Sequence, residues 1–448
     1  MGEATRALAD WVYAKTWEST SVADQQSVLD SVVDTVGVAL AGTREHVSIL
    51  VREHVLSTFR PGTAQVWGTK HCLSQVGAAL CNGTAAMSQE FDDRHIRHGH
   101  PSCVLVPALL SAAQAESLGG WQLLEGYVAG VGVFAAAGYL YGAHREPRLE
   151  PRGWHITAIL GTIGAAAGVA KAIGLDAGQI ATAMGIAASL TAGLSGNATS
   201  PTKSVHAGRA ASSGIDAAML ARSGLTCADG ALDGEHGAMM AFGHQPGAAV
   251  ITGPDVIDEL LAIAEQGSGG LIRKRFPTFG ATHLAIEAAL DVRSQLPVGA
   301  ELAAIHVRLP PPRGGRVVSF TGKPTTPEEA RHSFRYVVAA ALARGELLPA
   351  HFARDALFDP ATRAVWPLVA VSEDGAEGNY AEVTVQLAGG QRFAKRREFP
   401  PQMISGPVVD AKFLGCAGVI MDRTAAGELL TRLRGLADRA DMTGLLRF

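Results

Sequence analysis

Four short segments hold most of the side chains in this sequence that could move protons or bind an anion. The first runs from Asp92 to His100 and contains two adjacent carboxylates and three histidines. Because imidazole titrates near neutral pH, such a segment can accept and release protons. Histidine and aspartate also bind metals, but the HExxH spacing of zinc proteases is absent. A proton-transfer site, a metal site and a solvated loop are the three interpretations of this string.

The second segment ends at His155, just before an apolar helix that we expect to begin near Thr157. A histidine at the start of a helix faces the positive end of the helix dipole, which favours the neutral imidazole. A neutral imidazole can act as a base, so His155 is a candidate for proton transfer. A structural histidine is the alternative interpretation.

The third segment contains Lys203, His206 and Arg209. Residues three apart share one face of a helix, so Lys203 and His206 are expected to lie side by side. Together with Arg209 they would form a cationic group at a helix N-terminus, where anions bind well. The alternative is an ordinary solvated start of a helix.

The fourth segment is the run of three cations Arg273, Lys274 and Arg275, which follows the glycine-rich stretch 267–270. A glycine-rich stretch after a long helical region suggests a domain junction. Small ligands commonly bind between domains, so this run could contact an anionic substrate. A solvated run of charges is again the alternative.

The elements around these segments predict a mainly α protein with a large all-helical domain and a smaller α+β lid domain. Up to about residue 265 the apolar residues follow helical spacing, interrupted by Gly, Asp and Pro. Residues 304–309 and 381–387 alternate like strands, whereas residues 327–344 and the C-terminal tail are again helical in pattern. We therefore expect residues 1–266 and 406–448 to form the helical domain and residues 267–405 to form the lid.

Composition narrows the function classes. The 448 residues carry 38 Lys and Arg against 42 Asp and Glu, a formal net charge of −4, so a nucleic-acid partner is not expected. The uncharged stretch 126–143 is long enough to span a membrane, but it is rich in Gly and Ala, and we predict a buried helix. Dinucleotide and P-loop motifs are missing, and no cofactor is expected. Five cysteines without a CxxC pair favour reduced thiols in the cytoplasm.

Taken in order, the four segments resemble the MmgE/PrpD family. The matching stretches are Cys81–Asp93, Gly99–Ser102, Gly153–Asp176, Thr202–Thr226, Lys274–His283 and Glu328–Leu342. Each string alone is weakly specific, whereas the ordered set is specific and spans nearly the whole chain.

The resemblance implies a soluble homodimer with a helical domain, a lid domain and a cleft between them, acting on a small polycarboxylate. Members of the family include 2-methylcitrate dehydratases, cis-aconitate decarboxylases and an iminodisuccinate epimerase. Family active-site positions fall on a set of acidic and basic residues, with His206 nearby. These positions are Asp93, His100, His155, Lys203 and Lys274.

In this family the shared chemistry is proton movement next to a carboxylate, which needs fixed positive charge to stabilise the carbanion. We assign Lys203 and Lys274 to the substrate carboxylates, with help from Arg275. His100 and His155 are the expected proton donor and acceptor, and Asp93 is expected to orient or charge one of them. His206 and Arg209 complete the expected substrate contacts.

Two departures from the decarboxylase-like members affect the predicted reaction. Those members carry a histidine where this chain has Phe279, and a tyrosine before the EARHSF string, where residues 317–320 of this chain contain none. Decarboxylation and dehydration need an additional proton donor, whereas epimerisation needs only the removal and return of one proton. The sequence therefore favours a cofactor-independent epimerase acting on a dicarboxylate such as iminodisuccinate, with a lyase of the same family as the alternative.

Overall fold

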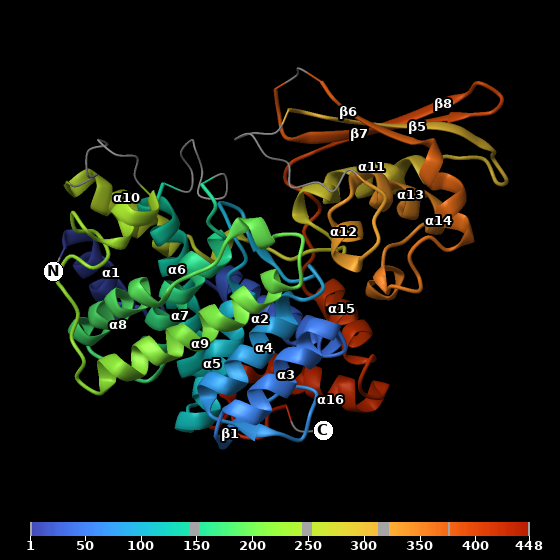
Figure 1. Ribbon diagram of the computed structural model, residues 1–448. Coiled ribbons are helices and arrows are strands. Elements are labelled where there is room, and N and C mark those ends of the chain that lie inside the picture. The colour runs from blue at the N-terminus through green and yellow to red at the C-terminus, as the bar shows by residue number, and fades with distance from the viewer. Residues whose placement is uncertain (1, 143–151, 244–252, 312–321, 375–376, 447–448) are drawn as a thin grey trace. The chain divides into compact units, whose positions relative to one another are not determined.

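The structure is a computed structural model that describes residues 2–142, 152–243, 253–311, 322–374 and 377–446. Its helices and strands confirm the predicted fold class, mainly α with a smaller α+β part (Figure 1). The chain divides into two compact units. Unit 1 contains residues 1–88, 92–273 and 404–448, and unit 2 contains residues 89–91 and 274–403. The sequence-based domain limits at 266/267 and 405/406 lie seven and two residues from the corresponding unit limits at 273/274 and 403/404.

Unit 1 is helical apart from short strand pairs. Its long helices pack around one extended apolar core, and a smaller apolar cluster includes Val55, Ala64 and Leu80. The helices are α1 (Glu3–Ala14), α2 (Val22–Gly42), α3 (His46–Thr58), α4 (Gln75–Met87), α5 (Ser102–Glu116), α6 (Gly120–Leu140), α7 (Ile156–Ala172), α8 (Ala177–Leu190), α9 (Thr202–Arg222), α10 (Pro254–Glu265), α15 (Pro407–Ala417) and α16 (Arg423–Arg434). The paired strands are β1 (Pro61–Gln65) with β2 (Cys72–Leu73) and β3 (Arg94–His95) with β4 (Leu271–Ile272).

Helices α6 and α7 pack backbone to backbone through glycines spaced four residues apart. A Cβ on Gly168 would lie 2.5 Å from the carbonyl oxygen of Gly126, and a Cβ on Gly164 would lie 2.7 Å from that of Gly130. These distances are shorter than van der Waals contact, so only glycine fits the interface. The small residues of these two helices thus allow their backbones to pack closely.

Helix α6 is long and apolar enough to cross a membrane by length and composition alone. Its most apolar stretch is wholly buried inside the structure, as in the core helix of a soluble protein. The burial agrees with the prediction of a buried helix for residues 126–143, of which the last lies outside the described residues.

Unit 2 contains a four-stranded sheet in the order β6-β5-β7-β8, with β5 and β6 parallel and the other pairs antiparallel. The strands are β5 (Leu302–Leu309), β6 (Val369–Glu373), β7 (Tyr380–Leu387) and β8 (Arg392–Glu398). The helices are α11 (His283–Arg293), α12 (Pro327–Arg331), α13 (Phe334–Arg344) and α14 (Pro360–Val365). Alternate residues of β5 and β7 are buried against α11 and α13, which lie on one face of the sheet (Figure 1).

The hairpin between β7 and β8 turns at Gly389 and Gly390, and Gly390 has a positive φ of 85°. Strand β8 forms one edge of the sheet and carries Arg392, Lys395, Arg396 and Arg397. The predicted single helix 327–344 is wrong in one respect, because it breaks at His332 and Ser333. The Ser333 side chain accepts a hydrogen bond from the backbone N–H of Tyr336 and so begins a new helix.

Candidate active site

The Asp93 carboxylate is fully buried in unit 1 and caps the first turn of α5. Its Oδ2 accepts a hydrogen bond from Ser102 Oγ at 2.5 Å, and its Oδ1 accepts one from the Ser102 backbone N–H at 3.3 Å. Ser102 Oγ also lies 2.5 Å from the hydroxyl of Tyr127. The carboxylate therefore faces the core of the helical unit, where it accepts hydrogen bonds from Ser102 rather than from an imidazole.

Burial raises the pKa of Asp93 to about 7, because desolvation penalises the charged carboxylate. The nearby carboxylates of Asp34 and Asp92 raise it further, whereas the hydrogen bond from Ser102 and the charge of Arg273 lower it. Arg273 itself is buried and donates to Ser27, Ser31 and the carbonyl of Ile404. Asp93 thus changes its protonation near neutral pH as part of a buried polar network.

His100 is held by its neighbour Asp92. The Nδ1 atom of His100 lies 3.1 Å from Asp92 Oδ2 and 2.9 Å from the backbone carbonyl of Asp93. Both partners are acceptors, so the hydrogen-bond geometry places the proton on Nδ1. Nε2 is then the atom through which His100 can exchange a proton with a substrate. Asp93 contributes its backbone to this arrangement, and the orienting side chain is Asp92, which was not among the selected site residues.

A backbone hydrogen bond joins His100 to the start of α7. Its N–H donates to Thr157 Oγ1 at 3.1 Å, and Thr157 lies two residues after His155, the residue that precedes α7. His155 is 8% exposed. The two histidines expected to transfer protons are therefore both attached to the start of one helix, His100 through its hydrogen bond to Thr157 and His155 through the chain.

His155 forms a pair with His206. Their Nδ1 atoms lie 3.0 Å apart, and their rings are tilted by 48° with centroids 5.1 Å apart. Burial lowers the pKa of His206, and the positive charge of Lys203 lowers it further. His206, expected to be a substrate ligand, thus has an imidazole as its direct neighbour.

Two loops fix the position of His155. Trp154 pairs with Leu194 as an isolated antiparallel bridge, and the His155 backbone N–H donates to the carbonyl of Gly193 at 3.1 Å. A Cβ on Gly193 would lie 2.7 Å from Ala158 Cβ and 3.4 Å from His206 Nδ1. The loop after α8 therefore lies directly on the histidine pair, and its closeness requires glycine.

Lys203 lies in the first turn of α9, one turn before His206, and is 7% exposed. Helix α9 begins at Thr202, so both residues are helical, as expected from their spacing. Gly208 sets how closely α9 approaches α4, because a Cβ there would lie 2.2 Å from the carbonyl of Leu80. Arg209 is exposed, and one of the charges near it is Asp216. The structure thus brings Lys203 beside the histidine pair, while the role of Arg209 stays a prediction.

The remaining predicted residues belong to unit 2. Lys274 is buried, and its Nζ donates to Glu90 Oε2 at 3.1 Å and to the Glu90 carbonyl at 2.9 Å. His332 Nε2 lies 3.8 Å from Glu90 Oε1, and the His332 ring stacks on Phe279 with centroids 4.9 Å apart. Arg275 is exposed and donates to Gln402 Oε1 at 2.7 Å. Sequence reasoning missed Glu90 and His332, although both lie in stretches that carry the family resemblance.

The other two histidines of the first segment have structural surroundings. His95 Nε2 lies 3.1 Å from the carbonyl of Gly267, and His98 is buried beside Phe134. Burial lowers the pKa of His95 to about 4 and that of His98 to about 3, so both are neutral at pH 7. Within the described ranges, no three His, Cys, Asp or Glu side chains are arranged to hold a metal ion.

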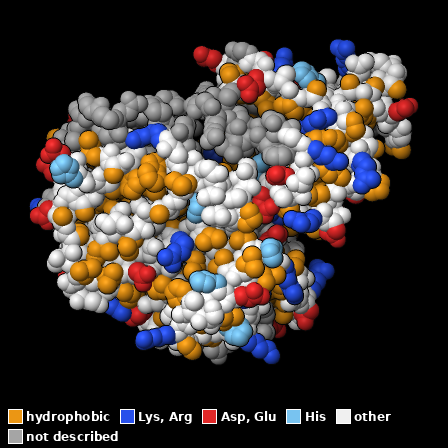
Figure 2. Space-filling model, viewed as in Figure 1, with side chains coloured by type: hydrophobic (Ala, Val, Ile, Leu, Met, Phe, Trp, Pro, Cys, Tyr) orange, Lys and Arg blue, Asp and Glu red, His pale blue; other side chains and the backbone are white. Residues whose placement is uncertain are grey.

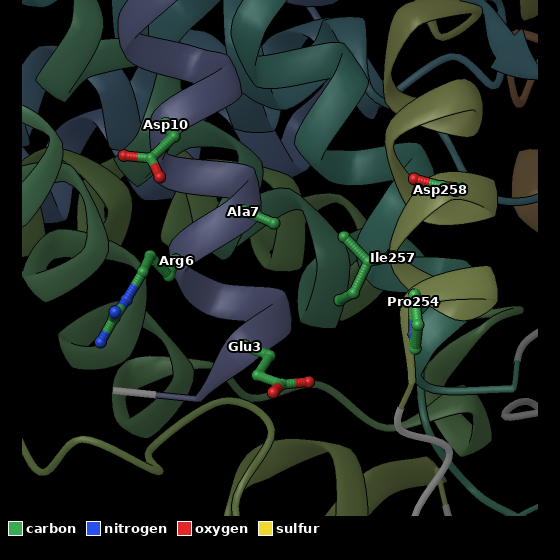
Figure 3. Close-up of a pocket in the computed structure, with 7 residues that line it drawn as sticks. All are labelled: Glu3, Arg6, Ala7, Asp10, Pro254, Ile257 and Asp258. Carbon is green, nitrogen blue, oxygen red and sulfur yellow. The ribbon is translucent and has the colours of Figure 1, made fainter.

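An open groove of about 570 Å³ lies elsewhere in unit 1, between α1 and α10 (Figure 3). Its charged residues are Glu3, Asp10 and Asp258 against the single cation Arg6. Excess carboxylate disfavours a polycarboxylate ligand. On the face of the helical unit shown in Figure 2, acidic and basic side chains are interspersed. The histidine site therefore combines a lysine with imidazoles, whereas this groove does not.

Comparisons with known proteins identify the relatives of this chain. Residues 6–250 match the MmgE/PrpD N-terminal domain, and residues 276–433 match the MmgE/PrpD C-terminal domain. Human cis-aconitate decarboxylase is 28% identical over 92% of this chain and 88% of its own length, and the mouse protein is 27% identical over 93% and 87%. A cis-aconitate decarboxylase-like protein of Aspergillus oryzae is 25% identical over 99% and 97%. These relatives favour the lyase alternative over the epimerase. The two matches together span most of the sequence, and the chain belongs to the MmgE/PrpD family.

Proposed function

We propose that this chain is a lyase that decarboxylates a small unsaturated polycarboxylate such as cis-aconitate. The human and mouse relatives are cis-aconitate decarboxylases, and each match covers most of this chain and most of the relative. The observation that carries the proposal is the grouping around the start of α7 and α9. An Asp-oriented imidazole, a pair of imidazoles and a buried lysine lie there within one helical unit.

The proposed reaction breaks the carbon–carbon bond to one carboxylate, which leaves as carbon dioxide. The bonding electron pair stays on the substrate and spreads into the neighbouring double bond and carboxylate. A proton from an imidazole N–H then adds to carbon and completes the product. General acid catalysis of this kind contributes about 10²- to 10⁴-fold in rate, so the imidazoles of His100 and His155 are the central groups.

Lys203 is proposed to bind the substrate carboxylate that takes up the developing negative charge. Its side chain is mostly buried beside the histidine pair, and a desolvated ammonium stabilises an anion more strongly than one in water. Lys274 is a weaker candidate for this role, because Glu90 balances its charge at 3.1 Å. Arg275 and Arg209 are exposed, and we assign them to the outer substrate contacts.

Epimerisation of a dicarboxylate is the second candidate, favoured by one feature of unit 2. Phe279 stands where decarboxylase-like members carry a histidine, and it stacks on His332 instead of offering a proton. The region 317–320, where the sequence lacks the expected tyrosine, lies outside the described residues. A site with fewer proton donors would suit the removal and return of a single proton.

Proton NMR in deuterated water with cis-aconitate, 2-methylcitrate and iminodisuccinate separates the candidates. A decarboxylase releases carbon dioxide from cis-aconitate and places deuterium at the protonated carbon. A dehydratase forms an alkene, and an epimerase exchanges a proton at a stereocentre without forming one. If cis-aconitate is unchanged while iminodisuccinate exchanges, the decarboxylase proposal is wrong.

Lys203→Met tests the carboxylate-binding role in the same assay. We expect its kcat/KM to fall at least about 100-fold, since the charge that stabilises the carbanion is lost. The matched control is Lys70→Met, at an exposed lysine of unit 1 outside the site. Near-wild-type turnover in Lys203→Met would contradict the assignment. We further propose that the protein acts in the cytoplasm as a homodimer and without a cofactor. Light scattering of the purified chain measures its molar mass and so tests the dimer.

A further inference from the structure

The contact between His155 and His206 restricts where protons can reside. With their Nδ1 atoms 3.0 Å apart, two unprotonated nitrogens would oppose their lone pairs, and two protonated nitrogens would oppose their hydrogens. A stable contact therefore holds one proton, donated by one Nδ1 and accepted by the other.

This sharing determines the state of the two outer nitrogens. In a neutral pair, the imidazole that donates through Nδ1 has a lone pair at Nε2 and can act as a base. The imidazole that accepts at Nδ1 carries a hydrogen at Nε2 and can act as an acid. The two roles are exchanged when the shared proton moves across the contact while the basic Nε2 takes up a proton and the acidic Nε2 loses one.

We propose that His206 is the positioning and relay partner of His155, passing the proton that His155 exchanges with the substrate. This inference rests on the proposed function. For uptake of a proton, His155 Nε2 accepts it, the Nδ1 proton of His155 moves to His206 Nδ1, and His206 releases its Nε2 proton to solvent. Delivery of a proton to the substrate is the reverse sequence, so charge and atoms balance in both directions.

The surroundings support a relay rather than a substrate contact for His206. Both members of the pair are held in position. The His155 backbone N–H donates to the carbonyl of Gly193, and His206 lies within α9. Burial, and then the charge of Lys203 one turn away, lowers the pKa of His206 and so favours its neutral form, which the accepting partner requires. His206 is only partly buried, which gives its outer nitrogen a route to solvent.

The kinetic test uses two substitutions that separate relay, orientation and substrate binding. In His206→Asn, the amide oxygen can still accept from His155 Nδ1 but cannot pass a proton, whereas His206→Leu removes both functions. A relay predicts that kcat falls about 10- to 100-fold in both variants with KM nearly unchanged. Wild-type kcat in His206→Asn, or a rise in KM alone, would overturn the relay. His54→Asn, at an exposed histidine of α3, is the matched control.

A spectroscopic test needs no substrate. In protein labelled with ¹⁵N-histidine, one shared proton predicts a scalar coupling between the Nδ1 nuclei of His155 and His206, absent in His206→Asn. Lack of this coupling in the wild type would refute the shared proton whatever the activity. If the coupling is present but cis-aconitate is not consumed, the proposed substrate fails while the pair stands. Thermal unfolding of each variant confirms that it is folded.

Discussion

At the residue scale, the adjacent carboxylates of Asp92 and Asp93 make different contacts. Asp92 contacts the ring of His100, whereas Asp93 contacts Ser102 in the core. The sequence identified this pair, but it could not say which carboxylate orients the histidine. Neighbouring side chains in a loop point in directions set by tertiary contacts, and no periodicity predicts them. For the same reason Glu90, with its positive φ of 54°, was not recognised as the partner of Lys274.

Asp92→Asn tests the orientation of His100. The amide retains the size of the side chain but removes the charge, and its NH₂ can face His100 Nδ1 and favour the wrong tautomer. We expect kcat to fall about 10- to 100-fold with little change in KM. Steady-state kinetics check this, with Asp10→Asn on the exposed face of α1 as the control. Unchanged kcat would show that Asp92 is not the orienting group.

Asp93 links stability to pH. Its folded pKa of about 7 lies above the unfolded value of about 4, so the folded state binds the proton more tightly. Its contribution is fully present below pH 4 and is lost as the pH rises through 7, on the order of a few kcal/mol. Denaturant unfolding of wild type and Asp93→Asn at pH 5 and pH 8 measures the difference. The wild type should lose more stability than the variant over this range, and equal losses would contradict the raised pKa.

At the scale of elements, the glycines between α6 and α7 control where His155 lies. Helix α7 carries His155 at its start, and its distance from α6 is set by Gly164 and Gly168. The sequence predicted both helices from their apolar spacing. It could not show that these helices contact each other, since a glycine in a helix has the same pattern whether it faces a neighbour or solvent.

Gly168→Ala is expected to destabilise the protein by about 1–3 kcal/mol, because the added Cβ would lie 2.5 Å from the Gly126 carbonyl and force the helices apart. Activity should fall as well, through displacement of His155. The control is Gly427→Ala in α16, where nothing lies within 4 Å of the added Cβ. There alanine should be neutral or stabilising by up to about 1 kcal/mol. Thermal unfolding compares the two, and equal effects would refute the packing argument.

At the scale of the whole molecule, residues distant in sequence complete each unit. Unit 2 includes residues 89–91, so the partner of Lys274 comes from 184 residues earlier in the chain. The spacing of apolar residues predicted the fold class, and the ordered set of matching sequence stretches predicted the family. Partners across such separations follow from tertiary structure alone, which is why the sequence selected Lys274 as a substrate ligand without its carboxylate.

A double-mutant cycle on Glu90 and Lys274 tests this pair. Removing one charge leaves the other buried, so Glu90→Gln and Lys274→Met should each cost about 3 kcal/mol. The double variant should cost much less than the sum, because no unpaired charge remains. Denaturant unfolding of the four proteins gives the coupling. Additive losses would show that the two side chains do not stabilise one another.

The cations of strand β8 have a consequence for solubility. An edge strand exposes unpaired backbone groups that can recruit a strand from another molecule and begin aggregation. Two copies meeting through β8 would bring Arg392, Lys395, Arg396 and Arg397 against the same four side chains. Glu398 balances Arg396 and Asp291 balances Arg397, so repulsion between Arg392 and Lys395 is what mainly opposes growth of the sheet beyond four strands. Substituting these cations with threonine or valine would convert a protected edge into a nucleus for fibrils, even with the folded unit unchanged.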